Sequence, residues 1–489
     1  MLALGFLLCA PASAQTLLAP AQPAWVTAGE TVRVRVGGPP GKSPRLVLSS
    51  GASSPMREVA SGEYEALTRA PGPGSTLPLK VDWGEGPREV GTVRVLGGET
   101  EAARVRTAEA VYRSGPHEDF DRYDPLLAGL VVQVTGRQGE WVRIHPGGGW
   151  VAAADLELLP AGTAISRPVL RTASIAETAD GLAVLTLRLG DPAPWQVETD
   201  PYQHRLVLHL PGASVAMGEV AYPPHSRRVE LLELRPGPEG LRVELDLGEE
   251  GLWGYSLEWR APDLRLRLAA PPEAGWTNPL PPGSPASIAA PLRGLRVVVD
   301  PGHGGGDTGA VGVGGLEEKD LNLRVSLALQ EELEAAGAIV TVTRREDREV
   351  ASPDAPAAQE LGARVRLAEA AGGQLFLSVH HNARPTIEEA RIAHGTDIYY
   401  YHPQSAPLAR ALAEPIARSM GEPDYRVLWR SFFVIRQTSM LAVLLELNYL
   451  SNPQVEAGML TRADYPVSVS RAIREGLEAF LRQSAAAGR

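Results

Sequence analysis

Two histidines and two glutamates in the last third of the chain have the types and places of a hydrolytic metal centre. His303 lies on a glycine-rich loop directly after an apolar run, and Glu318 opens a helical pattern. His380 and Glu446 each end a further apolar run. In open α/β sheets, functional groups gather past the carboxyl ends of such strands. Two imidazoles and a carboxylate are the ligands of zinc centres that keep a position open for water, and a second carboxylate can move that water's proton.

Each of these residues also has a plain structural interpretation. A histidine at the end of a strand is more often a hydrogen-bonded part of the fold, and a glutamate at a helix N-terminus more often interacts with the helix dipole. His381 directly follows His380, and strand alternation sends the two side chains to opposite faces of the sheet. Only one of the pair can therefore join the site. For His381 we favour structural packing over contact with a substrate.

Alternating strands and helices must position these residues. The region from Leu295 onward predicts an α/β layer fold, with a mostly parallel, largely buried sheet flanked by helices. The apolar runs that predict strands begin at Leu295, Ile339, Leu375, Asp397, Phe432 and Leu441. The helical periodicities cover 318–336, 359–371, 406–420 and 465–483.

The residues before this region predict only β structure, so the fold class is multidomain. Short alternating runs between Gly/Pro turns divide it into module 1 (15–98), module 2 (99–160) and module 3 (161–270). Module 1 reads as a small β-sandwich, and module 3 has longer strands with one buried face. A Pro/Ala-rich linker at 271–293 precedes the C-terminal domain at 294–484 and would give that domain reach.

Length, charge and the N-terminal residues limit the possible functions. At 489 residues the chain needs several cores, and its net charge of −11 argues against binding nucleic acid. The apolar run at 1–14 ends in a small-x-small site and predicts a signal peptide, hence export to the periplasm or cell envelope. No other apolar run approaches the length of a transmembrane span. Cys9 is the only cysteine and falls within the signal peptide, so thiolate metal sites and disulfides are excluded. We expect a monomer.

Six separated blocks of the C-terminal domain together resemble the zinc-dependent N-acetylmuramoyl-L-alanine amidases. The first block includes Asp300-Pro-Gly-His-Gly-Gly-Gly306 and thus His303. The blocks keep the family's order and spacing from Leu295 to about Leu481. They are Val299–Ala310, Gly315–Leu323, Leu361–Arg364, Leu375–Asn382, Phe433–Arg436 and Val443–Asn452.

The resemblance implies a role for each of the four candidates. His303, Glu318 and His380 would bind one Zn2+, and Glu446 would be the catalytic base. Glu318, and not the preceding Glu317, is assigned as the ligand. In the family the ligand glutamate immediately precedes a lysine, which stands here at position 319. The family hydrolyses the amide between the lactyl group of muramic acid and the first L-alanine of the peptidoglycan stem peptide. A role in cell-wall remodelling or daughter-cell separation follows as an expectation.

The resemblance extends less specifically to other residues and modules. Arg436, His381 and Asn382 are candidate substrate contacts, whereas Arg364 is expected to pair with a carboxylate and pin its helix to the sheet. Module 2 resembles a bacterial Src-homology-3-like barrel. Module 3 resembles the AMIN β-sandwich, which commonly precedes wall amidases and helps to localise them.

Some members of the family carry an inserted helix that blocks the zinc until a partner displaces it. Here about 30 residues separate the predicted strand ending at Tyr401 from the one beginning at Phe432, and the helix predicted at 406–420 belongs to the ordinary fold. We therefore expect no obligatory activator.

Three other functions compete with the amidase interpretation. A catalytically weak wall-binding protein is the main alternative, and the four intact site residues speak against it. A zinc carboxypeptidase would need His-x-x-Glu, which follows none of the ten histidines. A serine hydrolase would need Gly-x-Ser-x-Gly or Ser-x-x-Lys, and the sequence contains neither.

Overall fold

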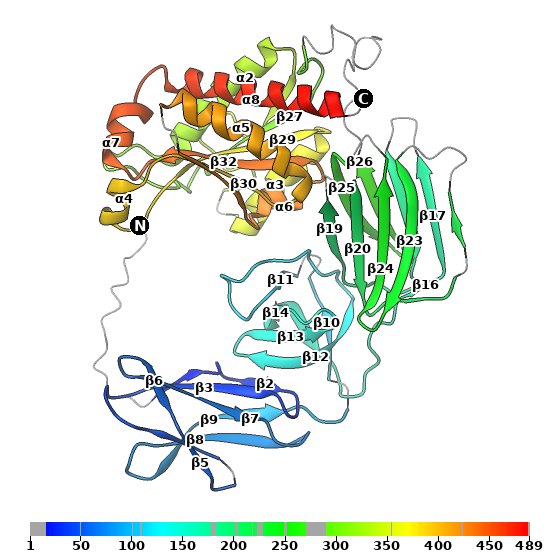
Figure 1. Ribbon diagram of the computed structural model, residues 1–489, viewed down its shortest axis with the longest axis vertical. Helices are drawn as coiled ribbons and strands as arrows, with labels where there is room; N and C mark the ends of the chain where they lie inside the picture. Colours follow the sequence, from blue (N-terminus) through cyan, green and yellow to red (C-terminus); the bar gives the residue numbers. More distant parts are fainter. Residues whose placement is uncertain are drawn as a thin grey trace.

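The computed structural model describes residues 16–487, apart from 49, 100, 108–109, 178–181, 201–203, 218, 223–227, 249–251, 270–289, 354 and 422–423. The predicted signal peptide and most of the predicted linker lie outside the described residues. The described part is elongated, with module 1 at one end and the C-terminal domain at the other (Figure 1). None of the helices described here is long and apolar enough to cross a membrane.

The C-terminal domain is built on a six-stranded sheet in the order β28-β27-β29-β32-β30-β31. All neighbouring strands pair in parallel except β30 and β32, which confirms the predicted mostly parallel sheet. Both faces of its central strands are apolar because helices cover both sides. The strands are β27 Arg296–Pro301, β28 Ile339–Val342, β29 Leu375–Asn382, β30 Thr396–Tyr400, β31 Tyr425–Trp429 and β32 Leu441–Tyr449.

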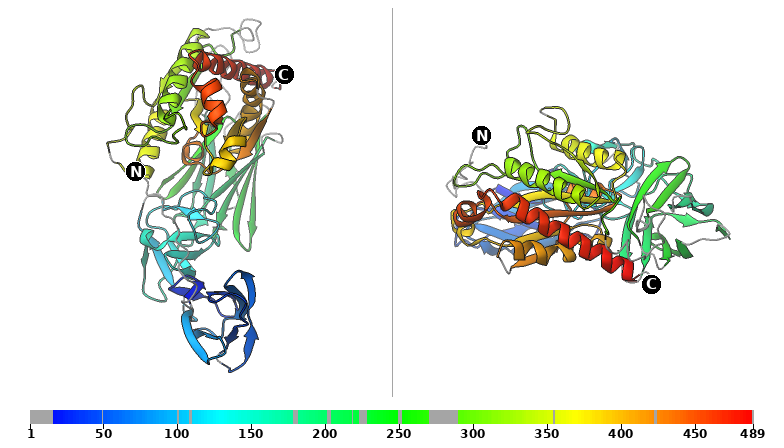
Figure 2. Two further views of the ribbon diagram at one scale, coloured as in Figure 1. Left: turned by 90° about the vertical axis from the view of Figure 1, so that its left-hand side faces the viewer. Right: turned by 90° about the horizontal axis from the view of Figure 1, so that it is seen from above.

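Helices cover the two faces of this sheet as separate layers (Figure 2). One face packs on α2 Glu318–Ala335, α5 Ala406–Ser419 and α8 Tyr465–Ala487. The other face packs on α3 Ala357–Ala370 and α6 Phe433–Gln437. Two short helices, α4 Ile387–Ile392 and α7 Pro453–Val455, lie near the carboxyl ends of β29 and β32 in the chain.

One predicted strand of the C-terminal domain was wrong. Most of the run from Phe432 to Arg436 lies in helix α6, which begins at Phe433, and β31 takes the edge of the sheet instead. Val434 and Ile435 are buried against the sheet face, next to Phe376 of β29. An apolar run this short fits a buried strand and a single helical turn equally well, so only the packing distinguishes them.

Modules 1 and 2 share a sheet, which runs from module 2 through β12 and β2 into module 1. Arg137 of β12 pairs with Trp25 of β2, so hydrogen bonding crosses the boundary predicted at 98/99. Module 1 contains β1 Thr16–Ala19, β2 Ala24–Val26, β3 Thr31–Gly37, β4 Arg45–Val47, β5 Ser53–Pro55, β6 Arg57–Ala60, β7 Glu63–Arg69, β8 Thr76–Asp82 and β9 Pro87–Val95. Module 2 contains β10 Ala102–Val105, β11 Tyr112–Arg113, β12 Val131–Gln138, β13 Trp141–His145, β14 Trp150–Ala152 and β15 Leu156–Leu158.

Module 3 is a sandwich of two sheets around one apolar core, as its alternating strands predict. A five-stranded sheet in the order β22-β17-β18-β26-β25 packs on a four-stranded sheet in the order β19-β20-β24-β23. Its strands are β16 Val169–Leu170, β17 Thr172–Glu177, β18 Ala183–Arg188, β19 Gln196–Asp200, β20 Arg205–Pro211, β21 Ser214–Val215, β22 Val220–Ala221, β23 Val229–Gly237, β24 Gly240–Leu247, β25 Gly254–Arg260 and β26 Asp263–Ala269.

Module 3 packs directly on the C-terminal domain through aromatic residues in and beside β25. The indole of Trp253 is buried, donates a hydrogen bond to the carbonyl oxygen of Gln374 at 2.7 Å, and lies 5.6 Å from the ring of Phe480. The hydroxyl of Tyr255 lies 2.9 Å from Nδ1 of His402. Gln374 immediately precedes β29, so this contact is at the amino ends of the parallel strands. The contact limits the reach that the linker could give to the C-terminal domain.

Replacing Trp253 with alanine is expected to destabilise the full chain by about 3 to 5 kcal/mol, because it empties an indole-sized volume in a shared core and leaves a buried carbonyl without its donor. Chemical denaturation of the full chain would measure the loss. Trp429→Ala removes an indole that is 44% exposed, and should cost far less. Equal destabilisation by the two variants would contradict the packing role of Trp253.

Candidate active site

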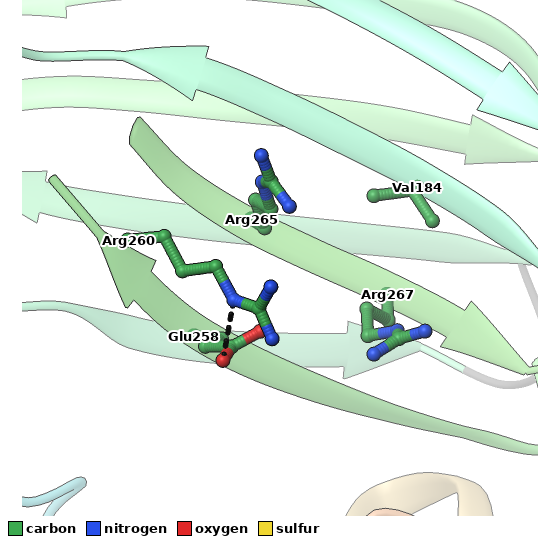
Figure 3. A pocket seen from close by; sticks show the side chains of 5 residues that line it. All are labelled: Val184, Glu258, Arg260, Arg265 and Arg267. Carbon is green, nitrogen blue, oxygen red and sulfur yellow. Dashed lines mark ion pairs between the residues drawn. The ribbon is translucent and has the colours of Figure 1, made fainter. Parts of the chain in front are cut away.

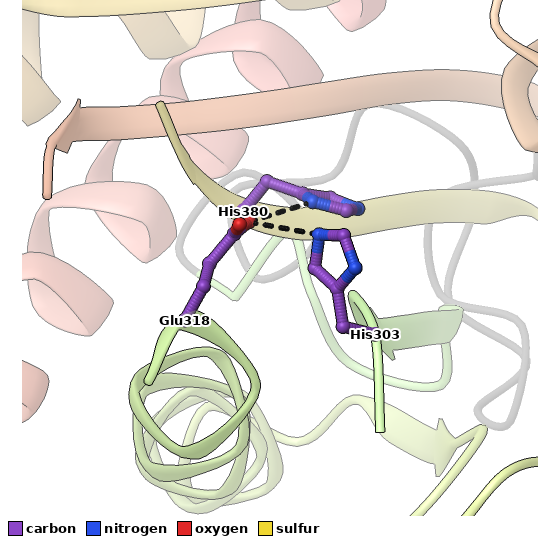
Figure 4. A group of neighbouring side chains, drawn as sticks. All are labelled: His303, Glu318 and His380. Carbon is purple, nitrogen blue, oxygen red and sulfur yellow. Dashed lines mark hydrogen bonds and ion pairs between the residues drawn. The ribbon is translucent and has the colours of Figure 1, made fainter. Parts of the chain in front are cut away.

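The four sequence-predicted residues meet at the carboxyl ends of the parallel strands. His303 follows β27, Glu318 is the first residue of α2, and His380 lies in β29. The ligand atoms of these three residues all lie within 4.8 Å of one another (Figure 4). Oε1 of Glu318 is 3.2 Å from Nε2 of His303 and 3.0 Å from Nδ1 of His380. The arrangement could hold one metal ion.

Two glycines of the first loop are required by the space around this cluster. A Cβ atom at Gly302 would lie 2.2 Å from the His380 ring. One at Gly309 would lie 2.6 Å from Oε2 of Glu318 and from the His303 ring. Any side chain at either position would displace a candidate ligand. Close approach to the cluster therefore explains the glycines at these two positions of the loop.

Two buried arginines hold the backbone that carries His303. Arg364 donates to the carbonyl oxygen of His303 at 2.7 Å and pairs with the buried carboxylate of Asp300 at 3.0 Å. Arg344 donates to the carbonyl oxygen of Gly302 at 2.9 Å. Arg364 thus joins α3 to the sheet through a carboxylate, in the manner that the sequence predicts. These contacts support the backbone of His303, which has a positive φ of 61°.

Asp307 orients His303, and the sequence analysis missed it. Its Oδ2 lies 2.8 Å from Nδ1 of His303, which leaves Nε2 facing Glu318. Burial lowers the pKa of His303, but the hydrogen bonds with Asp307 and Glu318 outweigh burial and raise that pKa to about 9. A carboxylate behind a histidine ligand fixes the ring and increases its basicity. The only sequence signal was an acidic residue four positions after the histidine.

Replacing Asp307 with asparagine is expected to weaken metal binding by about ten- to a hundredfold, because the neutral amide no longer supports the imidazole electrostatically. Competition with a chromogenic chelator would measure the affinity. Asp119→Asn is the matched control, since Asp119 pairs with His117 at 3.1 Å on module 2, outside the cluster. Unchanged affinity in the Asp307 variant would remove Asp307 from the site.

Glu318 is held as a carboxylate with both oxygens in use. Oε2 accepts a hydrogen bond from the backbone N–H of Ala310 at 2.9 Å, and Oε1 faces the two histidines. Burial raises the pKa of Glu318, but its bonds with His303 and His380 outweigh burial and hold that pKa far below its ordinary value. The side chain is therefore ionised and aimed at the point between the imidazoles.

Glu446 lies beside the cluster on the neighbouring strand. It is the register partner of His380 across β29 and β32, and of Asp397 across β32 and β30. Its Oε2 atom is buried and has no hydrogen-bond partner among the described residues. Burial raises the pKa of Glu446, and the neighbouring Glu318 carboxylate raises it further, well above its ordinary value. A buried carboxyl group with an uncommitted oxygen next to a metal-binding cluster is suited to moving a proton.

The three candidate substrate contacts fall in different environments. His381 is only 1% exposed, and its ring nitrogens lie 2.8 Å from Oδ1 of Asn322 and 2.9 Å from the hydroxyl of Tyr465. Burial lowers the pKa of His381 to about 3, so the ring is neutral. It has no exposed polar atom for a substrate, which matches the structural role favoured from the sequence. Asn382 donates to Asp397 at 3.0 Å, beside Glu446, and remains a candidate.

Arg436 is not brought to the site. It lies on α6, which leads into the amino end of β32, whereas the other candidates gather at the carboxyl ends. Its side chain is buried and donates to Oγ of Ser431 at 2.8 Å. Burial lowers its pKa to about 10. Ser431 in turn donates to the backbone of Arg122 in module 2. The interpretation of Arg436 as a substrate contact is therefore corrected. Its side chain supports the segment of the C-terminal domain that contacts module 2.

A hollow on the outer face of module 3, about 250 Å³ in volume, is separate from this site (Figure 3). Arginines dominate its lining, and Arg260 pairs with Glu258 at 2.7 Å. The other lining residues are Val184, Arg265 and Arg267. The lining contains no histidine or cysteine, so it offers neither a zinc-type ligand set nor a thiol nucleophile.

Residues 297–479 match the family model described as N-acetylmuramoyl-L-alanine amidase. A similar curated protein is named "Probable cell wall amidase LytH", from Staphylococcus epidermidis, with 29% identity over 51% of this chain and 82% of the relative. The protein of the same name from Staphylococcus aureus is 33% identical over 39% of this chain and 60% of the relative.

Two solved structures of similar sequence each cover just over a third of this chain. The catalytic domain of the N-acetylmuramoyl-L-alanine amidase CwlV from Bacillus (Paenibacillus) polymyxa is 32% identical, over 38% of this chain and 98% of that domain, with a TM-score of 0.34. The amidase AmiC2 of Nostoc punctiforme is 30% identical, over 38% of this chain and 97% of that structure, with a TM-score of 0.34.

Proposed function

We propose that the chain, whose residues 297–479 match the family model described as N-acetylmuramoyl-L-alanine amidase, is a zinc-dependent peptidoglycan hydrolase. It hydrolyses the amide between N-acetylmuramic acid and the L-alanine of the stem peptide. His303, Glu318 and His380 hold one zinc ion.

The single observation that carries this proposal is the convergence of two imidazoles and one ionised carboxylate, with an uncommitted buried carboxyl group beside them. Residues far apart in the sequence supply this set, and two glycines leave room for it. The donor types fit zinc, which commonly takes His₂Glu ligation in hydrolytic sites. Zinc held in such a site supplies Lewis acidity toward water and toward the amide carbonyl.

The chain's own residues supply the remaining steps. Asp307 fixes the His303 ring, and Arg364 fixes the backbone beneath it. Glu446 accepts a proton from the attacking water at its free Oε2 and gives that proton to the nitrogen of L-alanine as the amide breaks. Protonation of that nitrogen matters because an amide anion is a poor leaving group.

The test of the proposed function is digestion of purified peptidoglycan by the full chain. We expect the digestion to produce new free amino termini of L-alanine. Treatment with a chelator should abolish this release, and added zinc should restore it. Release of reducing sugars without free L-alanine would point to a glycosidase. Wall binding without any release would instead support the alternative of a catalytically weak wall-binding protein.

We further propose that the site works without an obligatory activator and that the protein acts after export, in the periplasm or cell envelope. The described residues of module 3 that contact the C-terminal domain pack at the amino ends of the parallel strands, opposite the cluster. Between β30 and β31, α5 packs into the core as part of the fold. The purified full chain should therefore digest peptidoglycan alone. A chain that stays inactive until a second protein is added would contradict this.

A further inference from the structure

A row of ionisable side chains extends from the metal-binding cluster toward the edge of the sheet. His380 of β29 is the register partner of Glu446 in β32, which pairs in turn with Asp397 in β30. Asp397 is the partner of Arg426 in β31. Directly paired residues in neighbouring strands project from the same face. The row therefore leads across one face of the sheet from the metal-binding cluster to Arg426.

At the far end of this row lies a pocket of about 550 Å³. Its walls come from the residues after β29, from α4, from the first residues of β30 and β31, and from the last residue of β32. The volume is in the range of small-molecule sites and suits one or two amino acid residues. The lining residues that the argument uses are Arg384, Glu389, Asp397, Arg426 and Tyr449.

Inside the pocket, Asp397 and Arg426 neutralise each other. Arg426 donates to both oxygens of Asp397, at 2.7 and 2.6 Å, in a bidentate pair. The hydroxyl of Tyr449 donates to Asp397 at 2.9 Å, and Asn382 donates to it at 3.0 Å. Asp397 is buried and held by these hydrogen bonds, and the group forms the floor of the pocket, although the Arg426 side chain itself is 52% exposed. The floor offers little net charge to a ligand.

Arg384 also lines the pocket, and the residues of the floor do not neutralise its charge. Its guanidinium lies 5.2 Å from the centre of the Tyr449 ring, and Nη2 donates to the Tyr449 hydroxyl at 3.1 Å. In the part of the chain that the structure describes, no carboxylate forms an ion pair with Arg384. The nearby carboxylate of Glu389 accepts a hydrogen bond from Thr386 instead. Stacking on an aromatic ring holds the guanidinium in place while its other donors remain exposed to the pocket.

We propose that Arg384 binds a carboxylate of the stem peptide, so that the peptide lies over β30 and β31 and the sugar lies on the side of β27 and α2. This inference rests on the proposed function. The lactyl carboxyl group is used up in the amide, so the N-acetylated sugar is neutral and the anionic groups of the substrate are on the peptide. The second residue, a D-glutamate, carries the carboxylate nearest to the bond that breaks.

The experiment compares two soluble substrates with full-length protein: N-acetylmuramoyl-L-alanyl-D-glutamine, whose only carboxylate is the α-carboxylate of the second residue, and its α-amide, in which both carboxyl groups of that residue are amides. Arg384→Gln should raise KM for the carboxylate substrate by about tenfold with kcat nearly unchanged, and should hardly alter KM for the amide. Arg384→Lys should recover part of the loss, because it keeps the charge but not the planar fork. Arg391→Gln, an exposed arginine of α4 outside the pocket, should behave like the unchanged chain.

A third substrate separates two sources of the carboxylate. A tripeptide stem with an amidated second residue and a free carboxylate on the third tests whether the more distant group is bound. Sensitivity to Arg384→Gln with this substrate also supports the proposal, and assigns the contact to the third residue. The proposal is overturned if Arg384→Gln leaves KM unchanged for every carboxylate substrate that the unchanged chain hydrolyses. Failure of the unchanged chain to release L-alanine even from whole peptidoglycan would instead refute the proposed function.

Discussion

Glu446→Gln is expected to lower kcat by at least about a hundredfold while the metal stays bound. Glutamine has nearly the same shape but cannot accept a proton, and general acid–base catalysis contributes about 10² to 10⁴ in rate. Because Glu446 is outside the ligand cluster, its loss removes no metal donor. Metal content by mass spectrometry and turnover of a soluble muropeptide, measured on the same preparation, would separate the two effects.

The matched control for this variant is Glu414→Gln, an exposed glutamate of α5 that pairs with Arg418 at 3.5 Å. This variant makes the same chemical change on α5, which covers the opposite face of the sheet from α3 and α6. It should keep normal turnover. Near-normal turnover by the Glu446 variant would show that another carboxylate accepts the proton. Loss of metal together with activity would mean that Glu446 belongs to the ligand set.

Replacing His303 or His380 with alanine is expected to abolish stoichiometric zinc binding and, with it, detectable hydrolysis. Each change leaves two protein donors in a site that uses three, and removing a ligand also leaves Glu318 as a buried, less compensated carboxylate. Zinc content after dialysis, together with peptidoglycan digestion, would measure both losses.

His117→Ala provides the comparison for these variants, because His117 is an exposed histidine of module 2. It should keep one zinc and full activity. If both the His303 and His380 variants retain one zinc per chain, the assigned ligand set is wrong. If zinc is lost but digestion continues, the chain hydrolyses peptidoglycan by a chemistry that does not need the cluster.

The sequence predicted most of the C-terminal fold and the places of the candidate ligands from local patterns, and the family resemblance proposed the role of each candidate. Buried parallel strands are short continuous apolar runs, and the residues at their carboxyl ends must meet at one edge of the sheet. This reasoning placed His303, Glu318, His380 and Glu446 at that edge, where the structure also has them. The same local reasoning separated His381 from His380 by strand alternation.

Local patterns were insufficient where the outcome depends on partners far away in the chain. The apolar run containing Arg436 fits a strand or a helical turn, and packing on the sheet decides for α6. The pair of Asp307 with His303 depends on how the loop folds back, which a spacing of four residues does not specify. The pairing of modules 1 and 2 through β2 and β12 depends on hydrogen bonds at strand edges, which carry no side-chain signature.

The sequence by itself therefore supplied candidates for metal binding and proton transfer, since their types and strand-end places are local properties, and its resemblance to the amidase family proposed a role for each. The tertiary structure alone decided what surrounds them. The register of β32, β30 and β31 aligns Glu446 with Asp397 and Arg426. The last residue of β32, Tyr449, lies under the guanidinium of Arg384. The hydrogen bond from Trp253 to Gln374 joins residues that are more than a hundred positions apart in the chain. Such contacts form between surfaces that become complementary only after each part has folded, so no short stretch of sequence contains them.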